Sequence, residues 1–226
     1  MGWDDWIRGA EVEPSLYAAD FGRLGEQIRV LLAGGARIFH FDVGDGYFVP
    51  PITFGPIVLK SISEAIHAGG GRIDCHLMVF YPERHLEALA NAGADSVTVH
   101  AEACGDRLPA VVEQARALGL QVGLAFNPET APERAAELSR SVDFILCMSI
   151  HPGYGGQEFM PDALRRISRL RELVGDRVHV QVDGGIGAEN ARDCHEAGAD
   201  LLVAGTSIFG AEDPVAAYRG LVDALR

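Results

Sequence analysis

The sequence lacks several features that would place a chain of 226 residues in a broad class of proteins. No stretch approaches the roughly 20 apolar residues of a membrane-spanning helix, and the N-terminal segment has no apolar signal core. Basic residues are few: 19 Lys and Arg stand against 32 Asp and Glu, for a net charge of −13. Such a chain repels nucleic acid and anionic membranes at long range. We therefore expect neither as a partner.

Cysteine is also scarce, and its four residues form no CxxC pair. They are Cys75, Cys104, Cys147 and Cys194. A chain of this size can bury a large core and needs no disulfide bridges to fold. The sequence therefore predicts buried, reduced thiols in a cytoplasmic protein.

The order of apolar segments predicts a single α/β domain. Short β-branched or apolar runs, typical of strands, alternate with longer amphipathic runs, typical of helices. Strands are expected over 13–17, 37–43, 72–78, 95–99, 121–125, 142–148, 178–182 and 200–204, and helices over, for example, 82–92, 107–118, 161–174 and 212–225. Such alternation implies parallel strands, and the chain length suits a closed (β/α)8 TIM barrel over residues 13–226. Residues 1–12 are expected to form an N-terminal extension that packs on the barrel or on a partner.

Polar residues at predicted strand ends point to a metal site. Residues two apart on a strand face the same way, so His40 and Asp42 share one face. His76 lies at the corresponding place on the next strand, and Asp183 ends the seventh. Burying such groups is costly unless they are paired or bind a metal. Satisfied hydrogen bonds would explain any one histidine, but the four together favour a divalent ion. Asp74 is a plausible second partner, while His100 and His151 are expected to line the site at most.

Three glycine loops follow the last three predicted strands. They are Pro152-Gly153-Tyr154-Gly155-Gly156-Gln157, Asp183-Gly184-Gly185-Ile186-Gly187 and Ala204-Gly205-Thr206-Ser207. Glycine lets backbone N–H groups converge on an anion without Lys or Arg. Barrels often hold a phosphate after strands seven and eight. The loops therefore predict a phosphate site.

At these residues the chain resembles the ribulose-phosphate 3-epimerase family. The similar segments run in order from residue 13 onward. They are Pro14-Ser15-Leu16 with Asp20-Phe21, His40-Phe41-Asp42-Val43 with Asp45-Gly46, Phe48-Val49-Pro50 with Ile52-Thr53-Phe54-Gly55, His76-Leu77-Met78-Val79, Pro152 to Phe159, Val182 to Ile186, and Ala204-Gly205.

The resemblance implies an isomerase that inverts carbon 3 of a ketose phosphate, converting D-ribulose 5-phosphate to D-xylulose 5-phosphate. In such enzymes the residues matching His40, Asp42, His76 and Asp183 bind a divalent metal, often zinc, with Fe²⁺, Mn²⁺ or Co²⁺ as alternatives. The residues matching Asp42 and Asp183 also act as the two acid/base groups, through an enediolate. The substrate and its phosphate would contact a wider set: Ser15, Met78, Met148, Gly153, Gly155, Gly156, Gly184, Gly185, Gly205 and Thr206. We also expect a homo-oligomer.

Some residues depart from the family pattern. Gly44 stands where the family usually has a Met that helps form an apolar floor with the residues matching Met78 and Met148. His151 replaces a short polar residue. A reshaped pocket for a hexulose phosphate such as allulose 6-phosphate is one interpretation; unchanged pentulose specificity is the other. Asn127-Pro128-Glu129-Thr130 and Gly205-Thr206-Ser207 resemble the allulose-phosphate branch.

Two other functions remain to be weighed. Related decarboxylases have an Asp-x-Lys-x-x-Asp strand, whereas Asp42-Val43-Gly44-Asp45 has no Lys. A non-catalytic sugar-phosphate sensor is the alternative of another class. It predicts the loss of a metal ligand or carboxylate, yet all four residues are present.

Overall fold

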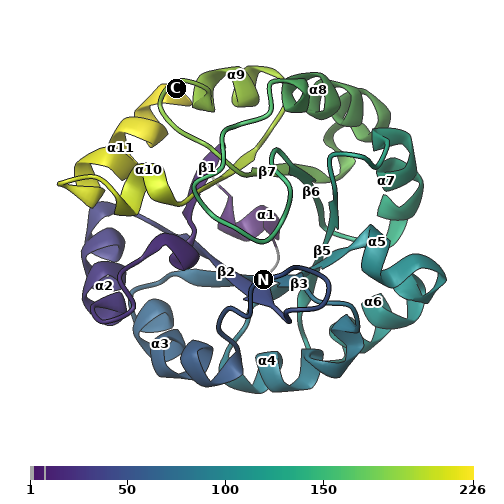
Figure 1. Cartoon of the computed structure of the whole chain (residues 1–226), viewed down its shortest axis with the longest axis horizontal. Coiled ribbons are helices and arrows are strands. Elements are labelled where there is room, and N and C mark those ends of the chain that lie inside the picture. Colours follow the sequence, from purple (N-terminus) through teal and green to yellow (C-terminus); the bar gives the residue numbers. More distant parts are fainter. Residues whose placement is uncertain (1–2, 8) are drawn as a thin grey trace.

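The computed structural model describes residues 3–7 and 9–226 and shows a barrel of eight parallel strands inside a ring of helices (Figure 1). The strands are β1 Glu11–Pro14, β2 Ile38–Gly44, β3 Arg72–Met78, β4 Ser96–His100, β5 Gln121–Phe126, β6 Phe144–Met148, β7 His179–Asp183 and β8 Leu201–Ala204. They pair in the order β1-β8-β7-β6-β5-β4-β3-β2, and a parallel bridge between Ser15 and His40 joins the two remaining edges. The predicted TIM barrel is confirmed.

Helices connect successive strands and cover the outside of the barrel. The longer ones are α2 Leu24–Gly34, α3 Pro56–Ala68, α4 Leu86–Ala92, α6 Leu108–Ala117, α7 Pro132–Leu138, α8 Asp162–Val174, α9 Ala191–Glu196 and α11 Pro214–Ala224. Short helices are α1 Trp3–Trp6, α5 Ala101–Cys104 and α10 Thr206–Phe209. Among the described residues, no helix is long and apolar enough to cross a membrane.

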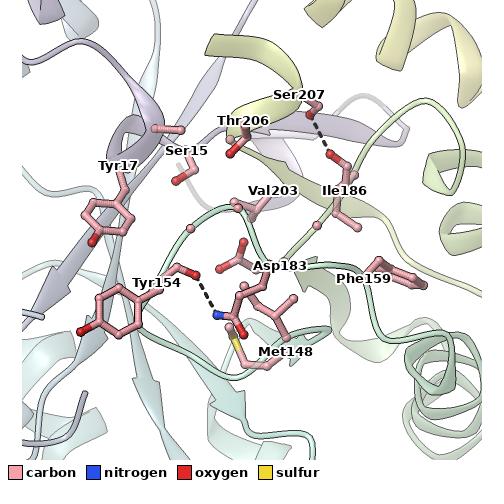
Figure 2. A pocket seen from close by; sticks show the side chains of 18 of the residues that line it. Ser15, Tyr17, Met148, Tyr154, Phe159, Asp183, Ile186, Val203, Thr206 and Ser207 are labelled. Atoms are coloured by element: carbon pink, nitrogen blue, oxygen red, sulfur yellow. Dashed lines mark hydrogen bonds between the residues drawn. The ribbon is translucent and has the colours of Figure 1, made fainter. Parts of the chain in front are cut away.

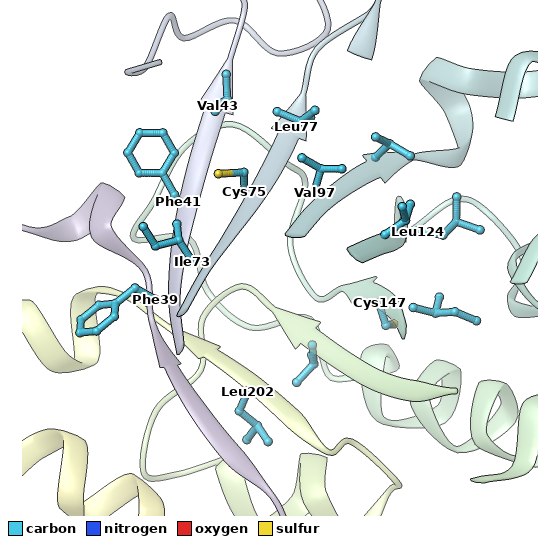
Figure 3. Close-up of a cluster of buried hydrophobic side chains, with 14 of the residues drawn as sticks. Phe39, Phe41, Val43, Ile73, Cys75, Leu77, Val97, Leu124, Cys147 and Leu202 are labelled. Atoms are coloured by element: carbon cyan, nitrogen blue, oxygen red, sulfur yellow. The ribbon is translucent and has the colours of Figure 1, made fainter. Parts of the chain in front are cut away.

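Alternation along the strands decides what faces the helices and what faces the barrel interior. Phe39, Phe41 and Val43 of β2 point outward into the apolar layer beneath the helices (Figure 3). Cys75 and Cys147 lie in the same layer, and all four cysteines are buried and free. The inward-facing residues of β2, which include His40 and Asp42, are buried too. The helix-covered layer therefore stabilises the barrel, and the inner face of β2 carries the polar pair His40 and Asp42.

The N-terminal helix closes one end of the barrel. Trp3 and Trp6 are buried in a cluster with Ile38, Phe144 and Leu201, from the starts of strands β2, β6 and β8. The Trp3 and Phe144 ring centroids are 4.4 Å apart, and Figure 1 shows α1 inside the ring of strands. Of the two packing partners considered for this segment, the described part of it packs on the barrel itself.

The first strand begins earlier than the sequence pattern suggested. It spans Glu11–Pro14 rather than 13–17, because Glu11 already pairs with Leu201 of β8 and the chain turns after the bridge at Ser15. Its two glutamates, Glu11 and Glu13, do not look like strand residues, yet both are buried. The last residues of the predicted extension are therefore the first residues of the sheet.

Candidate active site

A cavity of about 950 Å³ opens at the C-terminal ends of the strands. Its walls are the loops after β1, β6, β7 and β8, seen from close by in Figure 2. All of the predicted substrate and phosphate residues line it: Ser15, Met78, Met148, Gly153, Gly155, Gly156, Gly184, Gly185, Gly205 and Thr206. Asp42 and Asp183 are exposed to the same cavity. None of the described residues that line it is a Lys or an Arg.

Four side chains from three strands converge at the floor of this cavity. His40 Nε2 lies 3.2 Å from His76 Nδ1, and each of these nitrogens lies near Asp42 Oδ1, at 3.3 and 3.2 Å. Asp183 Oδ2 completes the group, 3.8 Å from His40 Nε2 and 3.7 Å from His76 Nδ1. The four residues predicted to bind a metal are thus brought together with one ligand atom each.

These distances fit a cation with tetrahedral coordination. A metal ion with ligands at about 2.0–2.1 Å has tetrahedron edges of about 3.3–3.4 Å. The five measured edges run from 3.2 to 3.8 Å. Two imidazoles and two carboxylates are a donor set that suits zinc and other first-row divalent ions. The four residues therefore fit such an ion in both spacing and chemistry.

The second nitrogen of each histidine also faces a polar side chain. His40 Nδ1 lies 3.2 Å from Asp74 Oδ2, deep in the barrel, where Asp74 also accepts hydrogen bonds from Ser96 and Thr98. His76 Nε2 lies 2.8 Å from His100 Nε2. Asp74 is therefore placed where the sequence suggested, as the partner of a candidate ligand. His100 lies behind His76 and does not line the cavity.

The two aspartates have opposite electrostatic environments. Burial alone would raise the pKa of Asp42, but the charge of His40 and hydrogen bonds to both histidines lower it below its usual range. Ser15 Oγ also donates to Asp42 Oδ2 at 2.8 Å. Burial, with the nearby charges of Asp42 and Asp74, raises the pKa of Asp183 to about 7. Two carboxyl groups with separated pKa values are typical of acid/base pairs.

The loop after β7 requires its glycines. Gly184 and Gly185 have φ values of +121° and +65°, which L side chains rarely adopt. A Cβ at Gly184 would lie 2.3 Å from Ile150, and one at Gly185 would lie 2.6 Å from the Phe159 backbone. Ser207 Oγ donates to the carbonyl of Ile186 at 2.7 Å and so ties this loop to α10 (Figure 2). Positions 184 and 185 therefore require glycine, because the loops after β6, β7 and β8 approach one another closely here.

The two departures noted in the sequence do not enlarge the cavity. Gly44 is not among its lining residues, and a Cβ there would meet the carbonyl of Pro51 at 2.9 Å and Val49 at 3.0 Å. The loop after β2 thus fills the space that a side chain at position 44 would occupy. His151 does not line the cavity either, because its ring pairs with Glu129 at 3.1 Å on the surface.

Sequence reasoning missed two features of the site. Tyr17 and Tyr154 line the cavity and lie near each other in Figure 2. Glu102, two residues after the end of β4, accepts from His100 although it is remote from every motif. The spacing His100-x-Glu102 was the only signal for the second, and it is weak because an exposed acid in a first helical turn is common.

Comparisons with known proteins agree with this geometry. Residues 11–209 match the model of the "Ribulose-phosphate 3 epimerase family". The chain is 37% identical over 207 residues to the ribulose-phosphate 3-epimerase of Bacillus subtilis, covering 90% of this chain and 94% of the relative. It is 38% identical over 218 residues to that of Escherichia coli, covering 95% and 94%. A solved structure of 3-hexulose-6-phosphate synthase from Salmonella typhimurium superposes with a TM-score of 0.74 at 19% identity, covering 95% and 98%, and supports the fold.

The barrel, the family match and these relatives place the protein among the TIM-barrel isomerases, as a sugar-phosphate epimerase. Together they lead to one conclusion: the chain belongs to the ribulose-phosphate 3-epimerase family.

Proposed function

We propose that the protein is a metal-dependent 3-epimerase that interconverts D-ribulose 5-phosphate and D-xylulose 5-phosphate by two-base proton transfer. One observation supports this above all. Four ligand atoms from His40, Asp42, His76 and Asp183 meet at tetrahedral spacing on the floor of the cavity. Two of these residues are carboxylates, which can serve as the acid and the base of an epimerisation.

His40 and His76 would hold the metal through Nε2 and Nδ1, and each aspartate would contribute one oxygen. When bound, such an ion acts as a Lewis acid that polarises a carbonyl oxygen and so acidifies the neighbouring C–H. Asp42 and Asp183 reach the site from β2 and β7, strands that β1 and β8 separate in the barrel. They can therefore approach one sugar carbon from different sides.

In this proposal one of the two aspartates, Asp42 or Asp183, removes the carbon-3 proton, and the other supplies the new one. One carboxylate removes the proton from one face, which leaves an enediolate, and the other returns a proton to the opposite face. The roles reverse for the reverse reaction. Ser15 Oγ, which donates to Asp42 Oδ2, holds that carboxylate in place. Met78 and Met148, both buried at strand ends, form the apolar floor.

The glycine loops at the other side of the cavity would bind the phosphate. Gly184, Gly185 and Gly205 bring backbone close to the cavity, and Thr206 begins the short helix α10. Backbone N–H groups can hold a phosphate without a basic side chain. This agrees with the absence of Lys and Arg from the described lining and with a net charge of −13.

The structure favours the pentulose over a hexulose. The space at Gly44 is filled by the loop after β2, and the His151 ring points to Glu129. Asn127 and Thr130, whose segment resembles the allulose-phosphate branch, both donate to Glu102. A decarboxylase would need a lysine at the cavity, which none of the described lining residues supplies. A non-catalytic sensor would not need all four converging ligands.

The test is to compare kcat/KM on ribulose 5-phosphate and allulose 6-phosphate, before and after the metal is removed by a chelator and returned. We expect activity to disappear with the metal, to return with Zn²⁺, Mn²⁺, Fe²⁺ or Co²⁺, and to favour the pentulose. Full activity in the chelated protein would refute the metal dependence, and a preference for allulose 6-phosphate would refute the substrate. Binding of both sugars without turnover would favour the sensor.

A further inference from the structure

A row of hydrogen-bonded side chains leads from the floor of the cavity toward the surface. His76 Nε2 lies 2.8 Å from His100 Nε2, and His100 Nδ1 lies 3.3 Å from Glu102 Oε2. The two imidazole planes differ by 19°, so an N–H in one ring can point at a lone pair in the plane of the other. Both rings are fully buried, whereas the Glu102 side chain is 26% exposed. His100 and Glu102 themselves do not line the cavity.

Glu102 is fixed at the far end of this row. It lies in the short helix α5, directly after β4. Its Oε1 accepts from the backbone N of Asn127 at 2.8 Å and from Thr130 Oγ1, both in the loop after β5. Two donors on one oxygen leave the other oxygen, Oε2, directed at His100. The carboxylate is therefore positioned by a loop that does not contribute to the cavity.

The chemistry of the three groups gives the row a single direction. An ionised carboxylate only accepts, so His100 must carry its proton on Nδ1. A neutral imidazole has one donor and one acceptor nitrogen, so His100 Nε2 then accepts. His76 must therefore donate from Nε2, which leaves a lone pair on Nδ1. That nitrogen is the one that lies 3.2 Å from Asp42 Oδ1 and 3.7 Å from Asp183 Oδ2. In the other tautomer Nδ1 would carry the proton and donate it to Asp42, so Asp42 and the His100–Glu102 pair favour opposite tautomers of His76.

We propose that His100 and Glu102 are positioning residues that preset the tautomer of His76, so that its Nδ1 lone pair is ready to bind the metal. This inference rests on the metal site of the proposed function. It goes beyond that function, because it assigns roles to two residues outside the cavity.

A comparison with His40 shows why His76 needs an intermediate residue. We call the pair His100 and Glu102 the relay, because it links His76 to a carboxylate. His40 directs Nε2 to the site, and Asp74 lies directly at its Nδ1, at 3.2 Å. His76 directs the opposite nitrogen, Nδ1, to the site, so its Nε2 points away along the barrel wall. The carboxylate on that side is one residue further out, and His100 spans the gap. A carboxylate thus lies behind each histidine, at ion-pair distance from His40 and beyond a second ring from His76.

The experiment uses full-length protein with two variants and a matched control. Glu102→Gln keeps the shape of the side chain but adds a donor, which permits both directions of the row. His100→Phe fills the same space and leaves His76 without a partner. Glu129→Gln is the control, because Glu129 also pairs with a histidine near this rim, but with the surface residue His151. Affinities for Zn²⁺ and Mn²⁺ are measured by competition with a chelator, and the His76 tautomer by ¹⁵N NMR of metal-free protein.

Substitution of a residue that hydrogen-bonds to a metal-binding histidine typically weakens metal affinity about 10–100-fold. We expect about 10-fold weaker binding in Glu102→Gln, up to about 100-fold in His100→Phe, and no change in Glu129→Gln. NMR should show His76 protonated only on Nε2 in the wild type and on either nitrogen in Glu102→Gln. Unchanged affinity and an unchanged tautomer in Glu102→Gln would overturn the relay while leaving the metal site intact. A wild-type chain that binds no divalent ion would overturn the proposed function, and the relay with it.

Discussion

The same strands carry apolar side chains at one end of the barrel and polar side chains at the other. At the N-terminal end, Trp3 and Trp6 close the barrel by packing on Ile38, Phe144 and Leu201. Toward the C-terminal end, β2 carries His40 and Asp42 beneath a cavity of about 950 Å³. A single strand thus passes from a dry, apolar layer to a site with ligands for a cation. Stability and activity should therefore respond to substitutions at different ends.

The largest effect on activity without an effect on stability is expected when one carboxyl group at the open end is removed. Asp183→Asn should lower kcat/KM about 10²- to 10⁴-fold, because general acid/base catalysis by one residue contributes about that much. Stability should not fall, because burial disfavours the charged form of Asp183 in the native state and raises its pKa to about 7. Steady-state kinetics and thermal unfolding provide both measurements. Near-normal turnover would show that the two-base scheme is wrong.

The corresponding change at the closed end should do the opposite. Trp3→Ala removes a fully packed ring whose centroid lies 4.4 Å from that of Phe144. We expect the free energy of unfolding to fall by about 3 kcal/mol, the usual scale for an aromatic truncated to alanine in a core. Because the cavity lies at the other end, kcat/KM should stay within about twofold. Denaturant unfolding tests the first statement, and a large loss of activity in the folded variant would contradict the second.

A smaller effect should follow from restoring a side chain next to the open end. Gly44→Ala places a Cβ 2.9 Å from the carbonyl of Pro51 and 3.0 Å from Val49. Overpacking of this kind costs about 1–3 kcal/mol, and it should displace the loop after β2. Gly55→Ala is the control, since a Cβ there meets nothing within 4 Å. If Gly44→Ala is as stable as the wild type, the space at this strand end is not filled as described.

The smallest effect concerns pH. Burial would raise the pKa of Glu102, but hydrogen bonds from His100, Thr130 and the Asn127 backbone outweigh it and lower the pKa to about 2. Between this value and the ordinary 4.5, the unfolded chain binds the proton more readily than the native one, so stability falls with acid in that range. The stability advantage of the wild type over Glu102→Gln should be full above pH 5 and shrink toward pH 2. Urea unfolding of both proteins at several pH values measures this difference in the free energy of unfolding. A difference that stays constant from pH 5 to pH 2 would show that the Glu102 carboxylate is unpaired.

Much of the barrel could be predicted from the sequence because its determinants are local. Alternation along β2 places His40 and Asp42 on the inner face, and glycine at the C-termini of α2 and α4 adopts the left-handed conformation that turns each helix into a strand. The converging ligands could be predicted too, since parallel strands end at one edge.

The remaining features depend on contacts between distant segments. Glu11 is buried in β1, where it pairs with Leu201 from the far end of the chain, and its polar character placed the start of the first strand too late. The missing side chain at Gly44 suggested a larger pocket, but the loop at Val49 and Pro51 fills that space. Glu102 escaped notice because its partners, Asn127 and Thr130, lie on another loop. No period or motif encodes such contacts.

In the proposed mechanism, one of Asp42 and Asp183 removes the carbon-3 proton, and the other adds a proton from the opposite side of the substrate. The most direct measurement is the conversion of ribulose 5-phosphate in deuterated water, followed by analysis of hydrogen isotopes at carbon 3 during the first turnovers. Two-base transfer predicts xylulose 5-phosphate that carries deuterium at that carbon, while recovered substrate keeps its original hydrogen. Product that retains the original hydrogen at carbon 3 would rule out two-base transfer.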